Sequence, residues 1–197
     1  MSIRLPAMSS QAPTSSIGAH RASRGIAART GGEPRIRRTL GPGDVGAIAE
    51  QHGRLYAREF GLDVSFEADL ARALYEAAAR GWPTEREGIW IVERSGEMSG
   101  SLVLTDEGGG TGRVRAFLLD PALRGRGLGK RLLGELLDRT REAGYARLVL
   151  ETFSELRDAA RLYTELGFVL RWSRTEPRWG MERMTYQRYE LAPVDRR

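Results

Sequence analysis

The spacing of apolar and polar residues predicts one domain that mixes strands and helices and begins near residue 34. Short apolar or alternating runs between turn residues predict strands, and apolar residues spaced three and four apart predict helices. The expected strands cover residues 35–40, 89–94, 100–105, 113–119, 147–151, 168–174 and 183–191. The expected helices run from the turn Gly41–Asp44 to Phe60, from Ser65 to about Gly81, from Leu128 to Ala143 and over about 156–166.

The order of these elements predicts an α+β fold. Three strands follow the first two helices, and the residues joining them, Ser95–Glu97 and Asp106–Gly110, are of the hairpin type. After the third of these strands, helices and strands alternate. We therefore expect a mixed central sheet of six to seven strands with helices on both faces, in three layers α/β/α.

Residues 1–33 show neither the alternation of a strand nor the apolar spacing of a helix, and they are rich in Ser, Ala, Pro, Gly and Arg. We therefore expect a disordered tail before a domain at 34–197. A solvated tail, an organellar transit peptide and an over-long start before Met8 are all compatible with this composition. Residues 1–38 hold seven arginines and one glutamate, a charge of +6, which leaves −1 for the rest of a chain with net charge +5. We therefore expect no nucleic-acid binding by the folded domain.

Composition excludes several kinds of chemistry. The 197 residues include no cysteine, which rules out disulfides, thiolate metal sites and a cysteine nucleophile. The histidines His20 and His52 have no partners at metal-binding spacing, so no metal site is expected. No apolar run is long enough to cross a membrane, and the N-terminus lacks the apolar stretch of a secretory signal, so we expect a cytoplasmic protein without membrane contact.

A glycine-rich loop carries the main chemical signal. It comprises Arg124, Gly125, Arg126, Gly127, Leu128, Gly129 and Lys130, directly after a strand that ends Leu118-Leu119-Asp120-Pro121 and before an amphipathic helix. Glycines let successive backbone N–H groups close on a phosphate at a helix N-terminus, where the helix dipole also favours an anion. Neither the dinucleotide-binding fingerprint nor the P-loop has this spacing.

Arg-x-x-Gly-x-Gly in this position resembles the acetyl-CoA motif of the GNAT (GCN5-related) N-acetyltransferase superfamily. A second segment, Leu162-Tyr163-Thr164-Glu165-Leu166-Gly167-Phe168, is similar to the end of the family's fourth helix. The resemblance spans residues 36–191, and residues 52–63 further resemble the GNAT domains that bacteria attach behind MarR-type regulators.

The resemblance implies acetyl-CoA as co-substrate and a set of binding residues. The amides of Phe117, Leu118 and Leu119 would contact the pantetheine and the thioester carbonyl, and the glycine-rich loop would hold the pyrophosphate. Leu156 stands where the family often has an asparagine that contacts the cofactor, and Ser154 is a candidate replacement. Tyr163 is the candidate general acid that protonates the departing thiolate, and Glu151 is the candidate base acting through a water.

The acceptor is not fixed by the sequence. Small-molecule and peptide amines both remain open, and the resemblance is compatible with a homodimer. Residues from the first two helices and the last strands are candidates for acceptor recognition: Tyr56, Glu59, Asp63, Glu67, Trp172, Trp179 and Tyr186. The favoured function is N-acetyl transfer to a primary amine by direct attack in a ternary complex, and the alternative is a non-catalytic acyl-CoA-binding regulatory module.

Overall fold

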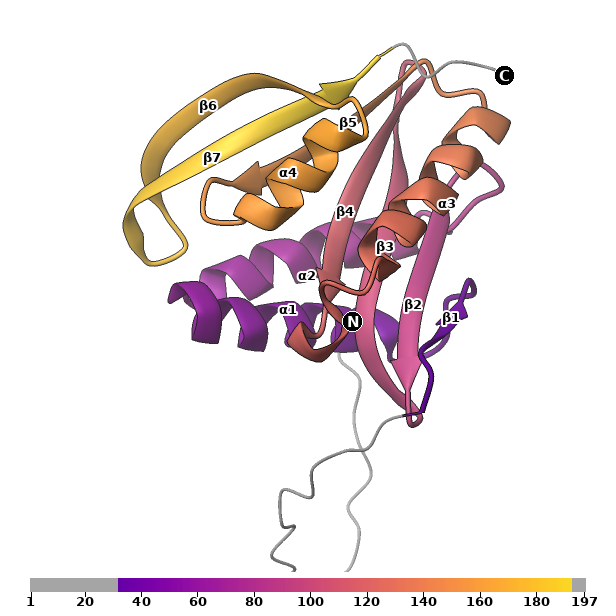
Figure 1. Cartoon of the computed structure of the whole chain (residues 1–197), viewed down its shortest axis with the longest axis horizontal. Coiled ribbons are helices and arrows are strands. Elements are labelled where there is room, and N and C mark those ends of the chain that lie inside the picture. Colours follow the sequence, from indigo (N-terminus) through magenta and orange to yellow (C-terminus); the bar gives the residue numbers. More distant parts are fainter. Residues whose placement is uncertain (1–31, 193–197) are drawn as a thin grey trace, which may run out of the picture. The chain divides into compact units, whose positions relative to one another are not determined.

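The computed structural model of the protein describes residues 32–192, and the tail expected before residue 34 lies almost entirely outside them. Seven strands and four α-helices make up this part of the chain (Figure 1). In chain order they are β1 (Arg35–Arg37), α1 (Asp44–Phe60), α2 (Val64–Ala79), β2 (Gly88–Arg94), β3 (Glu97–Gly108), β4 (Thr111–Leu119), α3 (Leu128–Glu142), β5 (Arg147–Phe153), α4 (Arg157–Glu165), β6 (Val169–Arg178) and β7 (Met181–Leu191).

The strands form a single mixed sheet in the order β1-β2-β3-β4-β5-β7-β6. Only the central pair β4 and β5 is parallel, and every other pairing is antiparallel. Helices α1 and α2 cover one face of the sheet and α3 and α4 the other (Figure 1). The expected α+β architecture with three layers is confirmed.

The core lies on both faces of the sheet. Leucines of α3, among them Leu132 and Leu136, pack with Leu104 and Leu148 of the sheet on one face. On the other face Ile48 and Leu74 of α1 and α2 pack against Ile91 and Val103. On α2, Leu74 and Ala77 are buried, as the helical spacing of the apolar residues predicts. Leu70 and Ala73, which share that spacing, are half-buried. Among the described helices, none is long and apolar enough to cross a membrane.

Several boundaries differ from those that the sequence predicts. Strand β3 continues through most of the expected loop 106–110, so that only Gly109 and Gly110 form the turn, with φ of 58° and 71°. Antiparallel pairing with β4 supplies hydrogen bonds that residue types alone do not reveal. Strand β1 stops at Arg37, where its pairing with β2 ends, and the Arg37 side chain lies 2.7 Å from Asp44 at the start of α1.

Candidate active site

Strands β4 and β5 separate in the middle of the sheet. Their pairing ends at Val114 and Leu150, so β4 from Arg115 onward and β5 from Glu151 onward have no ladder between them. Ala116 adopts φ of 44°, and the register against β3 shifts there, so β4 carries a bulge. The backbone groups of β4 that face β5 are thereby left free to bind a ligand.

The glycine-rich loop lies at the end of this opening. Gly125 (φ 71°) and Gly127 (φ 76°) adopt left-handed backbone conformations, and Gly127 caps α3 at its N-terminus. Because the first turn of a helix has no internal partners for its N–H groups, the amides of Leu128, Gly129 and Lys130 are available to an anion. A side chain at Gly129 would point towards Phe117, Leu119 and Leu162.

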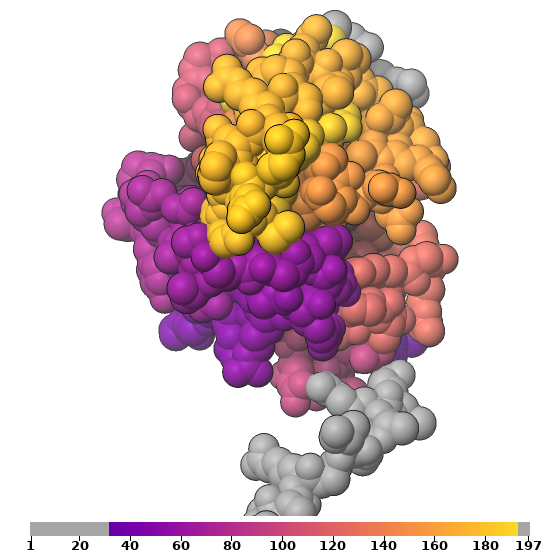
Figure 2. Space-filling model, turned by 90° about the vertical axis from the view of Figure 1, so that its left-hand side faces the viewer, coloured from indigo at the N-terminus to yellow at the C-terminus, as the bar shows by residue number. Residues whose placement is uncertain are grey.

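A cavity of about 1100 Å³ runs from the glycine-rich loop through the opening to α1, α2 and β7. Figure 2 shows the surface where α1, α4 and the loop before α3 meet around a recess. Nine residues predicted to bind or react with the cofactor line the cavity together with Glu151: Phe117, Leu118, Leu119, Arg124, Gly125, Gly127, Gly129, Lys130 and Tyr163.

Three predicted cofactor residues are not among those that line the cavity. Arg126 is exposed, and Leu128 packs partly against the core. The Ser154 amide donates to the Thr185 carbonyl (2.9 Å). Leu156, in the position of the family's asparagine, does line the cavity, as do Arg157 and Asp158. The roles of these residues stay predictions.

Arg124 fastens the loop to its surroundings. Its Nε donates to the Leu119 carbonyl at 3.0 Å, and both terminal nitrogens lie 3.1 Å from Glu59 Oε2. Glu59, predicted to recognise the acceptor, therefore links α1 to the glycine-rich loop. These bonds orient the loop through a side chain rather than through the amides at the start of α3.

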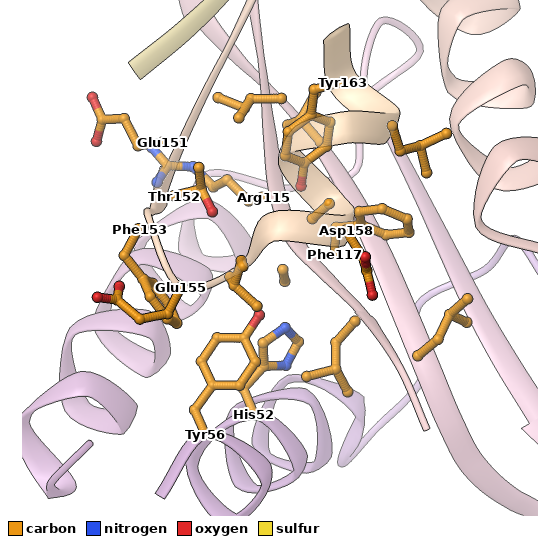
Figure 3. Close-up of a pocket in the computed structure, with 18 of the residues that line it drawn as sticks. His52, Tyr56, Arg115, Phe117, Glu151, Thr152, Phe153, Glu155, Asp158 and Tyr163 are labelled. Atoms are coloured by element: carbon orange, nitrogen blue, oxygen red, sulfur yellow. The ribbon is translucent and has the colours of Figure 1, made fainter. Parts of the chain in front are cut away.

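Tyr163 lies on α4 with its ring buried (5% exposed) between Phe168, Tyr189 and Phe117. Its hydroxyl makes no hydrogen bond within the described residues and points into the cavity (Figure 3). Burial raises the pKa of this phenol well above its usual range. The hydroxyl is therefore protonated near neutral pH and free to donate.

Glu151 is held by three donors. Its Oε2 accepts from Tyr186 Oη (2.9 Å) and pairs with Arg113 Nη1 (3.0 Å), and its Oε1 accepts from Arg188 Nη1 (3.0 Å). Burial opposes ionisation of Glu151, but Arg113, Tyr186 and Arg188 outweigh it and lower the pKa of the carboxyl. A carboxylate stabilised in this way is a weak proton acceptor.

His52 is a cavity residue to which the sequence analysis gave no chemical role. It is 2% exposed, and its Nδ1 lies 2.8 Å from the Ile48 carbonyl one turn earlier in α1. Because a carbonyl only accepts, Nδ1 carries the proton and Nε2 has a free lone pair. Burial lowers the pKa of His52 to about 4, and Nε2 has no partner among the described residues. Figure 3 shows the ring beside Tyr56 at the cavity wall.

The other predicted acceptor residues divide into two groups. Tyr56, Trp179 and Tyr186 line the cavity. Asp63 caps α2 by accepting from the Ser65 amide (2.9 Å), and Glu67 and Trp172 also lie outside the lining. Between residues 32 and 192 no cluster of acidic and histidine side chains could hold a metal ion.

Comparison with known proteins agrees with this geometry. The sequence profile of the Acetyltransferase (GNAT) family matches residues 52–168. The uncharacterized N-acetyltransferase YjgM of Escherichia coli K12 is 30% identical over 118 residues, which are 58% of this chain and 71% of that protein. The uncharacterized N-acetyltransferase C1271.07c of Schizosaccharomyces pombe is 30% identical over 142 residues, 70% of this chain and 83% of that one.

Solved structures share the fold. A putative acetyltransferase from Salmonella typhimurium, yncA, crystallised with acetyl-CoA, superposes with a TM-score of 0.62 over 83% of this chain and 95% of its own, at 19% identity. The family profile covers more than half of the chain, and the opening between β4 and β5 leads to the glycine-rich loop. The chain belongs to the GNAT acetyltransferase family.

Proposed function

We propose that this protein transfers an acetyl group from acetyl-CoA to a primary amine by direct attack in a ternary complex. The observation that carries the proposal is the continuous cavity, which extends from the glycine-rich loop through the opening between β4 and β5 to residues of α2 and β7. Two substrates entering from opposite ends would meet at this opening. No cysteine is present to form a thioester intermediate, which agrees with direct transfer.

The residues present fit acetyl-CoA, which supplies the activated acetyl group. The amides at the start of α3 would bind the pyrophosphate, and Lys130 adds positive charge beside them. The amides of Phe117, Leu118 and Leu119 would bind the pantetheine and polarise the carbonyl of the acetyl group, because a fixed N–H donor stabilises the negative charge that develops on that oxygen. The absence of a side chain at Gly129 keeps the space between β4 and α4 open.

Tyr163 would donate its proton to the leaving sulfur. Its hydroxyl is free within the cavity, and its raised pKa keeps it protonated. The same raised pKa makes it a weak acid, so the hydroxyl would act mainly by hydrogen bonding to the charge that develops on sulfur.

Two residues are candidates for removing the proton from the amine. Glu151 would act through a water, but its three donors and lowered pKa make it the weaker candidate. His52 lines the cavity with a buried, unpartnered Nε2, which would accept the amine N–H once the acceptor contacts that nitrogen. Its low pKa suits a late transfer, because the nitrogen becomes strongly acidic once the new C–N bond has formed.

The alternative, a non-catalytic acyl-CoA-binding module, draws support from Leu156 in place of the asparagine. The free Tyr163 hydroxyl and the extension of the cavity to α2 and β7, which leaves room for an acceptor, favour the enzyme. We also propose a cytoplasmic location. The kinship with domains found behind MarR-type regulators and the homodimer stay proposals that rest on the resemblance alone.

A thiol assay tests the function directly. The protein would be mixed with acetyl-CoA and a panel of primary amines, and released CoA would be measured with a thiol reagent. Since the chain has no cysteine, the protein contributes no background. We expect amine-dependent release, intersecting initial-rate lines and no acetylated enzyme in the mass spectrum. CoA that raises the melting temperature without release for any amine would favour the binding module.

A further inference from the structure

Strands β3, β4, β5 and β7 carry an unequal set of charges, of which Arg113, Arg115 and Glu151 line the cavity. Three guanidinium groups, those of Arg113, Arg115 and Arg188, surround two carboxylates, those of Glu107 and Glu151. We call these five residues the arginine cluster. Arg113 pairs with both carboxylates, and Arg188 lies 3.0 Å from Glu151 and 4.0 Å from Glu107. The cluster therefore holds one positive charge more than it neutralises.

Arg115 carries this excess. Its Nε donates to Thr105 Oγ1 at 3.2 Å, whereas its Nη2 lies 3.7 Å from Glu107, too far for a hydrogen bond. Neither of its terminal nitrogens donates a hydrogen bond to any acceptor within residues 32–192. Its side chain is 31% exposed and lines the cavity.

The position of Arg115 relates it to the reaction. Val114 is the last residue of β4 that pairs with β5, so Arg115 is the first residue past the point where the strands part. Figure 3 shows Arg115 in the same part of the cavity as Glu151 and Thr152 of β5. A group bound to Arg115 would thus lie beside the opening that leads to the glycine-rich loop.

Electrostatics favour an anion at this point. Burial and the neighbouring Arg113 lower the pKa of Arg115 to about 10, so its charge is poorly compensated yet persists at neutral pH. Guanidinium groups bind carboxylates through two parallel hydrogen bonds, and such charge-assisted bonds are about twice as strong as neutral ones. A bound carboxylate would supply the hydrogen-bond acceptors that the terminal nitrogens of Arg115 lack.

We propose that the acceptor is an amine that also bears a carboxylate, of the amino-acid class, and that the terminal nitrogens of Arg115 bind this carboxylate. The proposal rests on the proposed function and narrows its substrate. The amine of such an acceptor would extend from Arg115 towards the opening between β4 and β5. Neutral amines of the same size would leave the terminal nitrogens of Arg115 without a hydrogen-bond acceptor.

Matched acceptors test the proposal. L-leucine, L-leucinamide and 3-methylbutylamine share a side chain but differ in the group beside the amine, and L-phenylalanine, L-phenylalaninamide and phenethylamine form a second set. We expect kcat/KM to be at least about tenfold higher for the amino acid than for its amide or amine. A comparison of O-phosphoethanolamine with β-alanine tests a phosphate against a carboxylate as the acceptor's anionic group. We expect kcat/KM to be higher for β-alanine.

Variants assign the preference to Arg115. Arg115→Gln should lower kcat/KM for leucine by about 10- to 100-fold, the effect of losing hydrogen bonds to a charged group, with little change for leucinamide. Arg115→Lys keeps the positive charge but loses the forked geometry of the guanidinium. Its kcat/KM for leucine should therefore lie between those of the wild type and Arg115→Gln. Arg171→Gln is the control, because Arg171 pairs with Glu190 at 3.6 Å and lies outside the cavity lining. It should keep the selectivity of the wild type.

Binding without turnover gives a second readout. In the presence of CoA, N-acetyl-leucine should raise the melting temperature more than N-acetyl-leucinamide in the wild type, and equally in Arg115→Gln. Equal or better use of the amides, selectivity retained in Arg115→Gln, or preference for O-phosphoethanolamine over β-alanine would each overturn the proposal while leaving acetyl transfer intact. Failure of every amine to release CoA would instead count against the proposed function.

Discussion

A methyl group at Gly129 should weaken cofactor binding while leaving the free protein folded. In Gly129→Ala the new Cβ would lie 3.3 Å from Phe117 Cζ, 3.6 Å from Leu162 Cδ2 and 3.7 Å from Leu119 Cδ1. The first of these distances is tight, so the Phe117 ring must move by a few tenths of an ångström. In the free protein the ring has the cavity to move into. With CoA bound, the pantetheine would occupy that space.

Gly134→Ala in the same helix is the matched control, because its Cβ would meet nothing within 4 Å. Both substitutions increase helix propensity by up to about 1 kcal/mol. Gly134→Ala should therefore raise the melting temperature by about 2–4 °C, as expected for a domain of this size. Gly129→Ala should raise the melting temperature by less, because the tight contact with Phe117 offsets part of the gain in helix propensity.

The decisive measurement is the melting temperature with and without CoA. A ligand at about 100 times its Kd stabilises the native state by about 2.7 kcal/mol, equivalent to about 5–11 °C here. Overpacking costs about 1–3 kcal/mol, which weakens binding by about 5- to 150-fold. At the same CoA concentration, a tenfold weaker affinity leaves about 1.4 kcal/mol of stabilisation by CoA, and a hundredfold weaker affinity leaves about 0.4 kcal/mol. A full shift in Gly129→Ala would refute the placement of the cofactor.

Three further predictions concern single side chains. Tyr163→Phe should lower kcat by about 10²-fold and keep the melting shift with CoA, since the hydroxyl has no partner to lose; an unchanged kcat, measured where chemistry limits the rate, would make Tyr163 structural. Glu151→Gln should lower the free energy of unfolding by about 1–3 kcal/mol at pH 7. Because the folded-state pKa of Glu151 lies below its ordinary value of 4.5, this deficit should shrink in urea unfolding as the pH falls below 4.5; a deficit as large at pH 3 as at pH 7 would contradict this reasoning. His52 has a folded-state pKa of about 4 against 6.5 when unfolded, so it stabilises the native state above pH 6.5, and this contribution falls by about 1.4 kcal/mol per pH unit towards pH 4. His52→Gln should flatten that part of the stability profile, and an unchanged slope would show that His52 is not the titrating group.

Local features of the chain were predictable because short stretches encode them. The glycine-rich loop and α3 adjoin in sequence, and the positive φ angles at Gly125 and Gly127 need the residue type that stands there. The helix starting at Leu128 was predicted to its first residue, and the strand ending at Leu119 to its last. Apolar spacing alone is enough for such elements, since each buries one face.

The chemistry of individual side chains depended on partners from distant segments. Glu151 seemed an available base at a strand end, but Arg113 of β4 and Arg188 of β7 reach it only after the sheet has formed. His52 gave no signal in sequence, because its role depends on burial against the cavity and on the Ile48 carbonyl. Arg124 was assigned to phosphate from its motif, yet Glu59 of α1 binds its guanidinium.

The sequence by itself thus determined the fold class, the order of the elements and the cofactor loop, because these follow from periodicity and backbone preferences within short segments. Tertiary structure alone decided where β4 and β5 part, that the Tyr163 hydroxyl is free, and that the terminal nitrogens of Arg115 make no hydrogen bond within residues 32–192. Each of these properties depends on which partners a backbone or side-chain group meets after folding and which of its polar atoms stay without one. They arise only when β3, β4, β5 and β7 place Glu107, Arg115, Glu151 and Arg188 beside one another, partly buried, where water screens their charges less than it does in the unfolded chain.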